Sequence, residues 1–286
     1  MEKRKMTFTS YNQFMYDLQS GGIEYAVEKA KSLGFSGVEF LDFCGTGEPI
    51  DKEKFSAEAV RKALVEKGLS VDCYSVYANV ILPDEEYFMS EIKREIDYAA
   101  AVGSRLFHHT VVPYLKYECE MPEYSELLAL VLKREREIAK YCKECGLKLI
   151  FEPQGLFFNG VEGLSGLISA LRDEGYDIGF CADLGNPVYV DSDAGEIIDA
   201  LSFCLEHIHV KDYIVSDASL GREDEARSRG GKYLYEVLPE EGELDLGGYL
   251  KKLKATGYDG RISLEYGADD ETMKKTMHYI AKLWEE

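Results

Sequence analysis

The chain has few basic residues. Its 286 residues include 33 lysines and arginines against 53 aspartates and glutamates, which gives a formal net charge of −20. Binding to nucleic acid depends largely on basic side chains that neutralise phosphates, and anionic membrane surfaces attract the same side chains. The charge balance therefore argues against nucleic acid or a membrane as the main partner, although a local basic patch is compatible with a small anionic substrate. The acidic surface favours solubility.

Long apolar runs are also missing. The start at residues 1–5 is basic, but polar residues soon interrupt the sequence after it, so no secretory signal or membrane helix is expected.

Seven cysteines are scattered along the chain, which fits reduced thiols in a cytoplasmic protein. Cys142 and Cys145 form the one tempting metal-type pair. They lie in a charged helical stretch without a second pair, so we expect a structural role for them.

What is abundant is apolar sequence in short runs. Hydrophobic residues make up 45% of the chain, enough for a sizeable core, and no linker or low-complexity tract divides it. We therefore expect a single domain over residues 1–286. Eight strand-like runs are recognisable, at residues 6–10, 37–41, 70–76, 105–110, 147–152, 177–183, 207–211 and 261–266.

Amphipathic helical stretches alternate with these strands. In them apolar residues recur at three- and four-residue spacing. They include residues 23–33, 57–67, 86–101, 124–144 and 246–256. Gly34 and Gly257 each follow such a stretch and are expected to form a left-handed helix cap. Eight strands alternating with helices predict an α/β fold, a (β/α)8 TIM barrel.

One connection is much longer than the others. Residues 213–243 are polar and glycine-containing and include Arg222. In a barrel this segment follows the seventh strand, so it extends over the face where active sites form. Two interpretations stay open for it, a mobile surface loop and a lid that orders over the substrate.

Four of the strand-like runs end in a charged or imidazole side chain. An unpaired charge at the end of an apolar strand is costly to bury, so a shared divalent cation is the simplest partner. Three carboxylates and one imidazole favour Mn²⁺ over a thiolate-type zinc site, with Mg²⁺, Co²⁺ and Zn²⁺ as alternatives. The four candidate ligands are Glu152, Asp183, His209 and Glu265.

Short motifs around these residues resemble a known family. They are Phe151-Glu152-Pro153, Asp183-Leu184-Gly185-Asn186, His207-Ile208-His209-Val210-Lys211-Asp212 and Ser263-Leu264-Glu265. In combination they are similar to the sugar-phosphate isomerase/epimerase superfamily, the xylose-isomerase-like TIM barrels. The resemblance extends over nearly the whole chain.

The resemblance implies a function in carbohydrate metabolism. Ketose 3-epimerases of this superfamily hold one divalent metal with a Glu–Asp–His–Glu set, which implies the same four ligands here. It also implies that Glu152 and Glu265 are the catalytic acid and base on opposite faces of a sugar substrate. One carboxylate removes the proton next to the carbonyl and the other returns it, while a metal stabilises the enediolate. Proton movement along the chain instead gives aldose–ketose isomerisation.

Further polar residues are candidates for substrate binding. His108 and His109 end the fourth strand, where alternation allows only one of them to face the barrel interior. His207 shares a face with His209, which suggests a substrate contact or a supporting role behind the metal. A salt bridge is the alternative for Lys211, and a structural hydrogen bond for Glu39. The full candidate set is Glu39, His108, His109, His207, Lys211 and Arg222.

Several alternatives stay open. Val215 stands where the epimerases commonly have an arginine, and Asn186 where they often have a histidine, so an inosose-type dehydratase on the same scaffold is a second hypothesis. A non-catalytic carbohydrate-binding barrel is a third. An apurinic-site endonuclease is disfavoured because that branch needs additional histidine ligands. Substrate identity, its phosphorylation and whether the protein is a homo-oligomer are not determined by the sequence.

Overall fold

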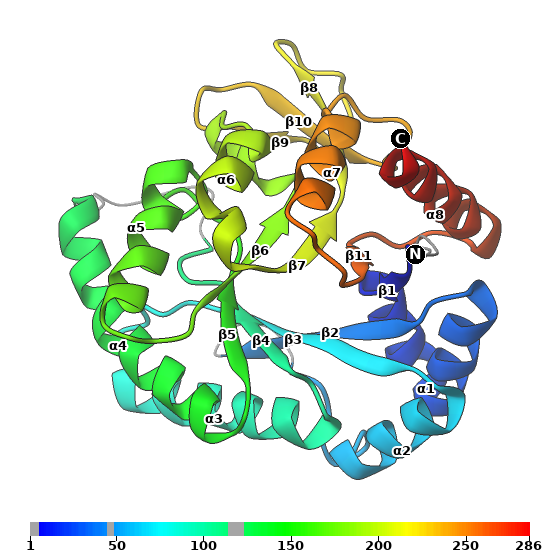
Figure 1. The fold of residues 1–286 in the computed structure, drawn as a ribbon, viewed down its shortest axis with the longest axis horizontal. Helices are drawn as coiled ribbons and strands as arrows, with labels where there is room; N and C mark the ends of the chain where they lie inside the picture. Colours follow the sequence, from blue (N-terminus) through cyan, green and yellow to red (C-terminus); the bar gives the residue numbers. More distant parts are fainter. Residues whose placement is uncertain (1–5, 45–48, 114–122) are drawn as a thin grey trace.

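The computed structural model describes residues 6–44, 49–113 and 123–286. Within these ranges, parallel strands close into a barrel in the order β1-β11-β7-β6-β5-β4-β3-β2, surrounded by helices (Figure 1). This confirms the predicted (β/α)8 barrel. The barrel strands are β1 (Phe8–Ser10), β2 (Gly37–Cys44), β3 (Ser70–Ala78), β4 (Leu106–His109), β5 (Lys148–Phe151), β6 (Gly179–Asp183), β7 (Leu205–Val210) and β11 (Ile262–Leu264).

The outer layer consists of α-helices that follow the barrel strands. Among the described residues, no helix is both long enough and apolar enough to cross a membrane. The basic start at residues 1–5 lies outside the described part of the chain. The helices are α1 (Asn12–Leu33), α2 (Ala57–Lys67), α3 (Glu85–Val102), α4 (Tyr124–Glu144), α5 (Val161–Asp173), α6 (Ala194–Leu201), α7 (Leu246–Ala255) and α8 (Asp270–Glu285).

Local sequence signals explain where many of these helices begin and end. The side chains of Ser56 and Asp84 accept hydrogen bonds from the first-turn amides of α2 and α3, which satisfies backbone donors that have no partner inside the helix. Gly34 and Gly257 have φ angles of 96° and 85°, so both adopt the expected left-handed conformation. The helix α1 begins earlier than predicted because helical residues continue before a kink at Gly22.

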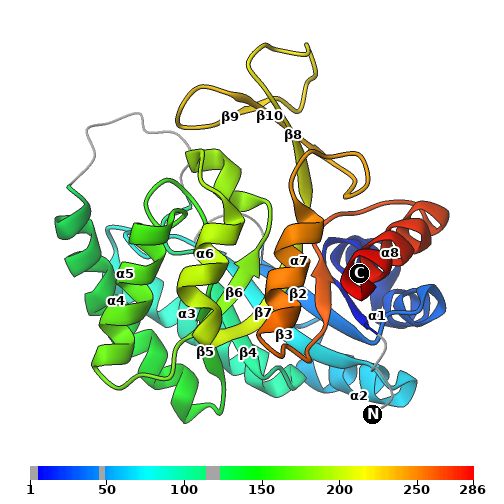
Figure 2. The ribbon, with the colours of Figure 1, turned by 45° about the horizontal axis from the view of Figure 1, so that its top comes forward.

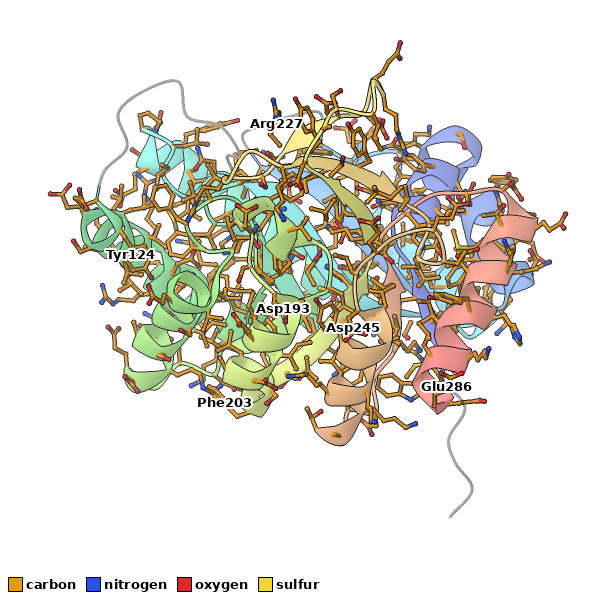
Figure 3. All side chains as sticks on the ribbon, turned by 90° about the horizontal axis from the view of Figure 1, so that it is seen from above. Tyr124, Asp193, Phe203, Arg227, Asp245 and Glu286 are labelled. Atoms are coloured by element: carbon orange, nitrogen blue, oxygen red, sulfur yellow. The ribbon has the colours of Figure 1, made fainter. Side chains whose placement is uncertain are left out.

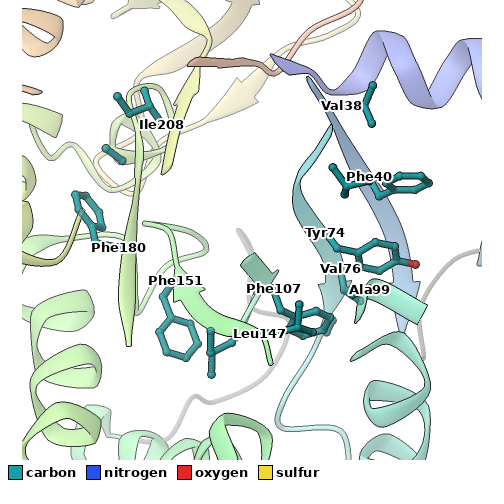
Figure 4. Close-up of a cluster of buried hydrophobic side chains, with 14 of the residues drawn as sticks. Val38, Phe40, Tyr74, Val76, Ala99, Phe107, Leu147, Phe151, Phe180 and Ile208 are labelled. Atoms are coloured by element: carbon teal, nitrogen blue, oxygen red, sulfur yellow. The ribbon is translucent and has the colours of Figure 1, made fainter. Parts of the chain in front are cut away.

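The strands of the barrel place alternate side chains on its two faces. Figure 4 shows outward-facing side chains such as Phe107, Phe151 and Phe180, which pack with the helices in the main core and are buried. Ile150 precedes Phe151 in the chain and Cys181 follows Phe180. Both belong to a separate small cluster. The same alternation directs Glu152 and Asp183 toward the barrel interior.

The long connection at residues 213–243 contains a small sheet where the sequence analysis expected a loop. Its strands are β8 (Asp212–Ser216), β9 (Ala226–Arg227) and β10 (Tyr233–Val237), which pair antiparallel in the order β8-β10-β9. Burial of Leu234 and Tyr235 favours this ordered arrangement over a solvated loop. The sheet projects beyond one end of the barrel (Figure 2). In Figure 3, Arg227 of this sheet and Phe203, which precedes β7, lie on opposite sides of the molecule.

Candidate metal centre

The four residues that the sequence analysis selected as ligands come together at the carboxyl ends of neighbouring strands. They belong to β5, β6, β7 and β11 or directly follow them, and these strands are adjacent in the barrel in that order. One side-chain oxygen or nitrogen from each of the four lies within 4.8 Å of the others. We call this set, Glu152, Asp183, His209 and Glu265, the carboxylate–histidine cluster.

The His209 imidazole is at the centre of the cluster. Its Nδ1 atom lies 2.8 Å from Glu152 Oε2, 3.5 Å from Glu265 Oε2 and 3.9 Å from Asp183 Oδ2. Three of the residues are buried, and the Glu265 side chain is 18% exposed. Four potential ligand atoms thus converge on one point, with an opening on the side of Glu265.

The chemistry of the cluster fits a divalent metal ion. The buried atoms Asp183 Oδ2 and Glu265 Oε2 accept no hydrogen bond and have only ionic contacts, to Lys211 and His209 respectively, although a buried carboxylate oxygen without a hydrogen bond is costly. Three carboxylates and one imidazole form a mainly oxygen donor set, which suits hard or borderline divalent cations. The cluster could therefore hold one such ion.

The surroundings of Glu152 and Glu265 shift the pKa values of the two side chains in opposite directions. Burial alone would raise the pKa of Glu152, but His108, His209 and Lys211 outweigh it and lower the pKa. Burial raises the pKa of Glu265 well above its usual value, and the nearby carboxylates Asp183 and Glu152 add to this effect, against the opposing effect of Lys211 and His209.

Lys211 adds a positive charge to the cluster. Its Nζ atom lies 2.9 Å from Glu265 Oε1 and 3.1 Å from Asp183 Oδ2, although the second contact lacks hydrogen-bond geometry. Burial would lower the pKa of Lys211, but the Asp183 and Glu265 carboxylates outweigh it and raise the pKa well above its usual value. The ammonium group is thus held beside the carboxylates of Asp183 and Glu265.

The two consecutive histidines of β4 have different environments. His108 Nε2 lies 3.6 Å from Glu152 Oε1 and is buried without a hydrogen-bond partner. His109 points outward, where its Nε2 atom contacts Glu135 of α4 at 3.1 Å and its ring packs against Phe151. His108 is therefore next to the cluster, whereas His109 belongs to the packing between barrel and helix.

Glu39 and His207, two other candidates for substrate binding, lie deeper in the barrel. His207 lines a cavity at the amino ends of the strands and its Nε2 atom contacts Glu39 Oε2 at 2.8 Å. Glu39 also contacts His209 Nε2 and accepts hydrogen bonds from Ser75 and Ser263. Both Glu39 oxygens are thus occupied, which leaves no acceptor for a substrate hydroxyl. The two serines were not predicted as part of the site. The sequence pattern that could have predicted them is a hydroxyl side chain on the inner face of an apolar strand.

Arg222 lies in the small sheet region, at a cavity of about 610 Å³. The cavity is also lined by Tyr213, which is two residues after Lys211, and by Tyr266, which follows Glu265. The Arg222 guanidinium pairs with Asp224 and is exposed, and none of the cluster residues lines this cavity. Arg222 is therefore at the rim of the site, already engaged by an acidic neighbour.

A second, independent metal centre is not found in the described part of the chain. Besides the cluster, two other groups of side chains could hold a metal, Glu39–His207–His209 and Glu152–Cys181–His209. Both contain His209, so they overlap the cluster.

Comparison with known proteins places the fold in a family. The chain is similar to 3-keto-D-glucoside 4-epimerase YcjR from E. coli, with 17% identity and a TM-score of 0.71 over 97% of this chain and 100% of the other. It is similar to the IOLI protein with a bound zinc atom, with 16% identity and a TM-score of 0.74 over 98% and 99%.

A third similar structure is the probable 3-DHS dehydratase AsbF from Bacillus anthracis, with 16% identity and a TM-score of 0.73 over 96% and 98% of the two chains. At these identities the likeness shows a shared fold. No curated protein sequence matches the chain. The family model described as xylose isomerase-like TIM barrel matches residues 27–283, nearly the full length. The chain therefore belongs to the xylose isomerase-like TIM barrel family.

Proposed function

We propose that this protein is a divalent-metal-dependent isomerase or epimerase that moves a proton at the carbon next to a carbonyl of a small sugar or sugar derivative. The observation that supports it most is the presence of two glutamates, Glu152 and Glu265, in one cluster with ligand geometry. They belong to β5 and β11, with β6 and β7 between them. A site that only binds a sugar has little use for two carboxylates placed in this way.

The metal would be held by the carboxylate–histidine cluster, with Mn²⁺ as the expected ion because most donors are oxygens. When bound, a divalent ion polarises the carbonyl and stabilises the negative charge that develops on its oxygen. Zinc is the alternative that the IOLI structure supports, since that relative contains a zinc atom.

The proton transfers belong to the side chains. Glu152 removes the proton next to the carbonyl, and Glu265, on the other side of the cluster, supplies a proton to the opposite face. The Lys211 ammonium and the unpartnered His108 Nε2 atom are placed to contact substrate oxygens beside these carboxylates. Removal and return on opposite faces invert the carbon centre.

The charges around the cavity at the rim favour an uncharged substrate. Its lining includes the carboxylates of Asp224, Glu236 and Glu241, and its arginine, Arg222, is paired with Asp224. A phosphorylated sugar would meet net negative charge along this cavity, which disfavours binding. We therefore propose a neutral sugar or sugar derivative.

Dehydration of a keto-sugar or cyclic polyol is the second candidate. The similarity to the probable 3-DHS dehydratase AsbF favours it, because loss of water next to a carbonyl also begins with removal of the neighbouring proton. The products distinguish the two reactions, since an epimer or isomer retains the mass of the substrate and a dehydrated product does not.

The test is product analysis with the metal-loaded protein. Neutral ketoses, aldoses, keto-glycosides and cyclic keto-polyols would be incubated with it, with phosphorylated counterparts in parallel, and followed by mass spectrometry and NMR. We expect conversion of a neutral compound without change in mass. Loss of 18 mass units, the mass of water, would support the dehydratase instead. Thermal stabilisation by a sugar without any conversion would support a binding protein.

A further inference from the structure

Glu39 is a fully buried carboxylate below the carboxylate–histidine cluster. It is on β2, which is separated from β7 in the barrel by β1 and β11. Its Oε1 atom lies 2.9 Å from His209 Nε2 and 2.7 Å from Ser75 Oγ. Its Oε2 atom lies 2.8 Å from His207 Nε2 and 2.6 Å from Ser263 Oγ. Four donors from three other strands thus hold one carboxylate in place.

This arrangement gives the two nitrogens of His209 different partners. The Nε2 atom faces the Glu39 carboxylate, while the Nδ1 atom faces Glu152, Asp183 and Glu265. Both nitrogens lie at hydrogen-bond distance from a carboxylate, Nε2 at 2.9 Å from Glu39 Oε1 and Nδ1 at 2.8 Å from Glu152 Oε2, so without a metal ion each can donate a hydrogen. Only Nδ1 faces the potential ligand atoms of the cluster, so a metal ion there would take the place of the hydrogen on Nδ1, while Glu39 would keep the hydrogen on Nε2.

We propose that Glu39 is a positioning residue, which fixes the tautomer and the orientation of His209 so that Nδ1 binds the metal. This inference rests on the proposed metal-dependent function. Histidine ligands generally donate their second ring hydrogen to a carboxylate, carbonyl or water, and this contact raises their basicity. Here the acceptor comes from a strand that contributes none of the four ligands.

The surroundings of Glu39 support a role beyond stability. Burying a carboxylate is costly even when it is paired, and an apolar residue of similar volume is often as stable or more so. The carboxylate is nevertheless held by Ser75 and Ser263, each bonded to a different oxygen. Contacts to both oxygens restrain rotation of the carboxylate, which keeps Oε1 directed at His209.

A matched pair of variants separates positioning from stability. Glu135, on α4, is also a buried glutamate that contacts a histidine ring, but its partner is the outward-facing His109. Both Glu39→Gln and Glu135→Gln replace a buried, histidine-bonded carboxylate by an amide of the same shape. Both are expected to lower the melting temperature, and only the first is expected to change metal binding.

The experiment measures the affinity for Mn²⁺ by calorimetry in the wild-type protein and both variants. We expect Glu39→Gln to weaken binding by about 10- to 100-fold, as is typical for loss of such a partner. We expect Glu135→Gln to stay within about twofold of the wild type. Equal affinity in Glu39→Gln and wild type, or equal losses in both variants, would overturn the positioning role.

A second measurement needs no variant and so is independent of whether Glu39→Gln folds. Nitrogen NMR of the histidine side chains in the Zn²⁺-loaded wild type is expected to show His209 with a hydrogen on Nε2 and the metal on Nδ1. A metal on Nε2 would overturn the proposal. If the wild type binds neither Mn²⁺ nor Zn²⁺, the proposed function fails together with this inference. If the wild type binds metal and Glu39→Gln binds it equally well, only the inference fails.

Discussion

Lys211 Nζ lies 2.9 Å from Glu265 Oε1, inside a cluster that otherwise consists of three carboxylates and one imidazole. Both side chains are largely buried, with exposed fractions of 6% for Lys211 and 18% for Glu265. The lysine thus reduces the repulsion among the carboxylates in the absence of metal.

Replacing Lys211 by methionine is expected to destabilise the metal-free protein. Removing one partner from a buried ion pair typically costs about 3–5 kcal/mol, because the remaining charge has no compensation. Mn²⁺ should recover more stability in Lys211→Met than in the wild type, since the carboxylates then lack their internal cation. Chemical unfolding with and without Mn²⁺ measures both effects. Equal stabilisation of the two proteins by the metal would contradict this interpretation.

Glu152→Gln and Glu265→Gln are each expected to reduce turnover by at least about 100-fold, the usual contribution of a general acid or base. Each glutamine keeps the volume of the side chain, so folding should change less than activity. Glu135→Gln is the control, because that buried glutamate contacts His109 outside the barrel. Turnover close to the wild-type rate in either active-site variant would remove the acid–base assignment.

The stability of the protein should contain a pH-dependent contribution from Glu95, far from the cluster in sequence. Burial and the neighbouring Asp42 raise the pKa of Glu95 from 4.5 to about 7, against the opposing effect of Lys52. The folded state therefore binds this proton more strongly than the unfolded state. The contribution of Glu95 to the free energy of unfolding is fully present below about pH 4.5 and is lost as the pH rises through 7.

Glu95→Gln is expected to flatten this dependence between pH 4.5 and 7. Each unit of pKa difference corresponds to about 1.4 kcal/mol, which sets the scale of the change. The measurement is the free energy of unfolding against pH for both proteins, with Glu86→Gln, an exposed position on the same helix, as control. Parallel curves for wild type and Glu95→Gln would show that Glu95 does not titrate in this window.

The small sheet at residues 213–243 is attached to the barrel through Asp191. Its carboxylate accepts hydrogen bonds from Ser228 Oγ and Gly230 N, both at 2.6 Å. Asp191→Asn keeps a side chain that tolerates the left-handed backbone found here, with φ of 55°, but weakens these contacts. We expect trypsin to cleave faster after Arg227 or Arg229 in this variant than in Asp173→Asn, an exposed control.

The proposal that this segment orders over a bound substrate makes an additional prediction. A compound that the protein converts should reduce cleavage in the wild type. It should have a smaller effect in Asp191→Asn, because the attachment of the sheet is already weakened. Identical cleavage rates with and without such a compound would count against a lid.

Much of the fold could be predicted because the signals are local. The helices α2 and α4 match the expected ranges 57–67 and 124–144, since each has clear apolar spacing. The sheet of β8, β9 and β10 was not predicted because polar and glycine-containing residues separate its strands. The start of α1 was missed because Gly21 and Gly22 interrupt the helical pattern.

The candidate site was only partly predictable, for a geometric reason. Alternation along a strand predicts which face a side chain occupies, but it does not predict the depth of that side chain in the barrel. Glu152 and Glu265 follow the ends of short strands and so reach the opening. Glu39 is the third residue of β2, an eight-residue strand, and is therefore deep inside. The outward direction of His109 likewise depends on the strand register, which the sequence does not reveal.

Proton exchange with solvent reports the removal of the proton next to the carbonyl by this protein. The Mn²⁺-loaded protein would be incubated in D₂O with neutral ketoses and keto-glycosides, the metal removed, and the sugars analysed by NMR. We predict deuterium at the carbon next to the carbonyl with wild type and none with metal-free protein or Glu152→Gln, whereas Glu265→Gln can still exchange the proton through Glu152 but forms at least about 100-fold less epimer. Exchange that persists without metal or in Glu152→Gln, epimer formation at the wild-type rate in Glu265→Gln, or no exchange by metal-loaded wild type across the panel, would show that the proposed proton transfers are wrong.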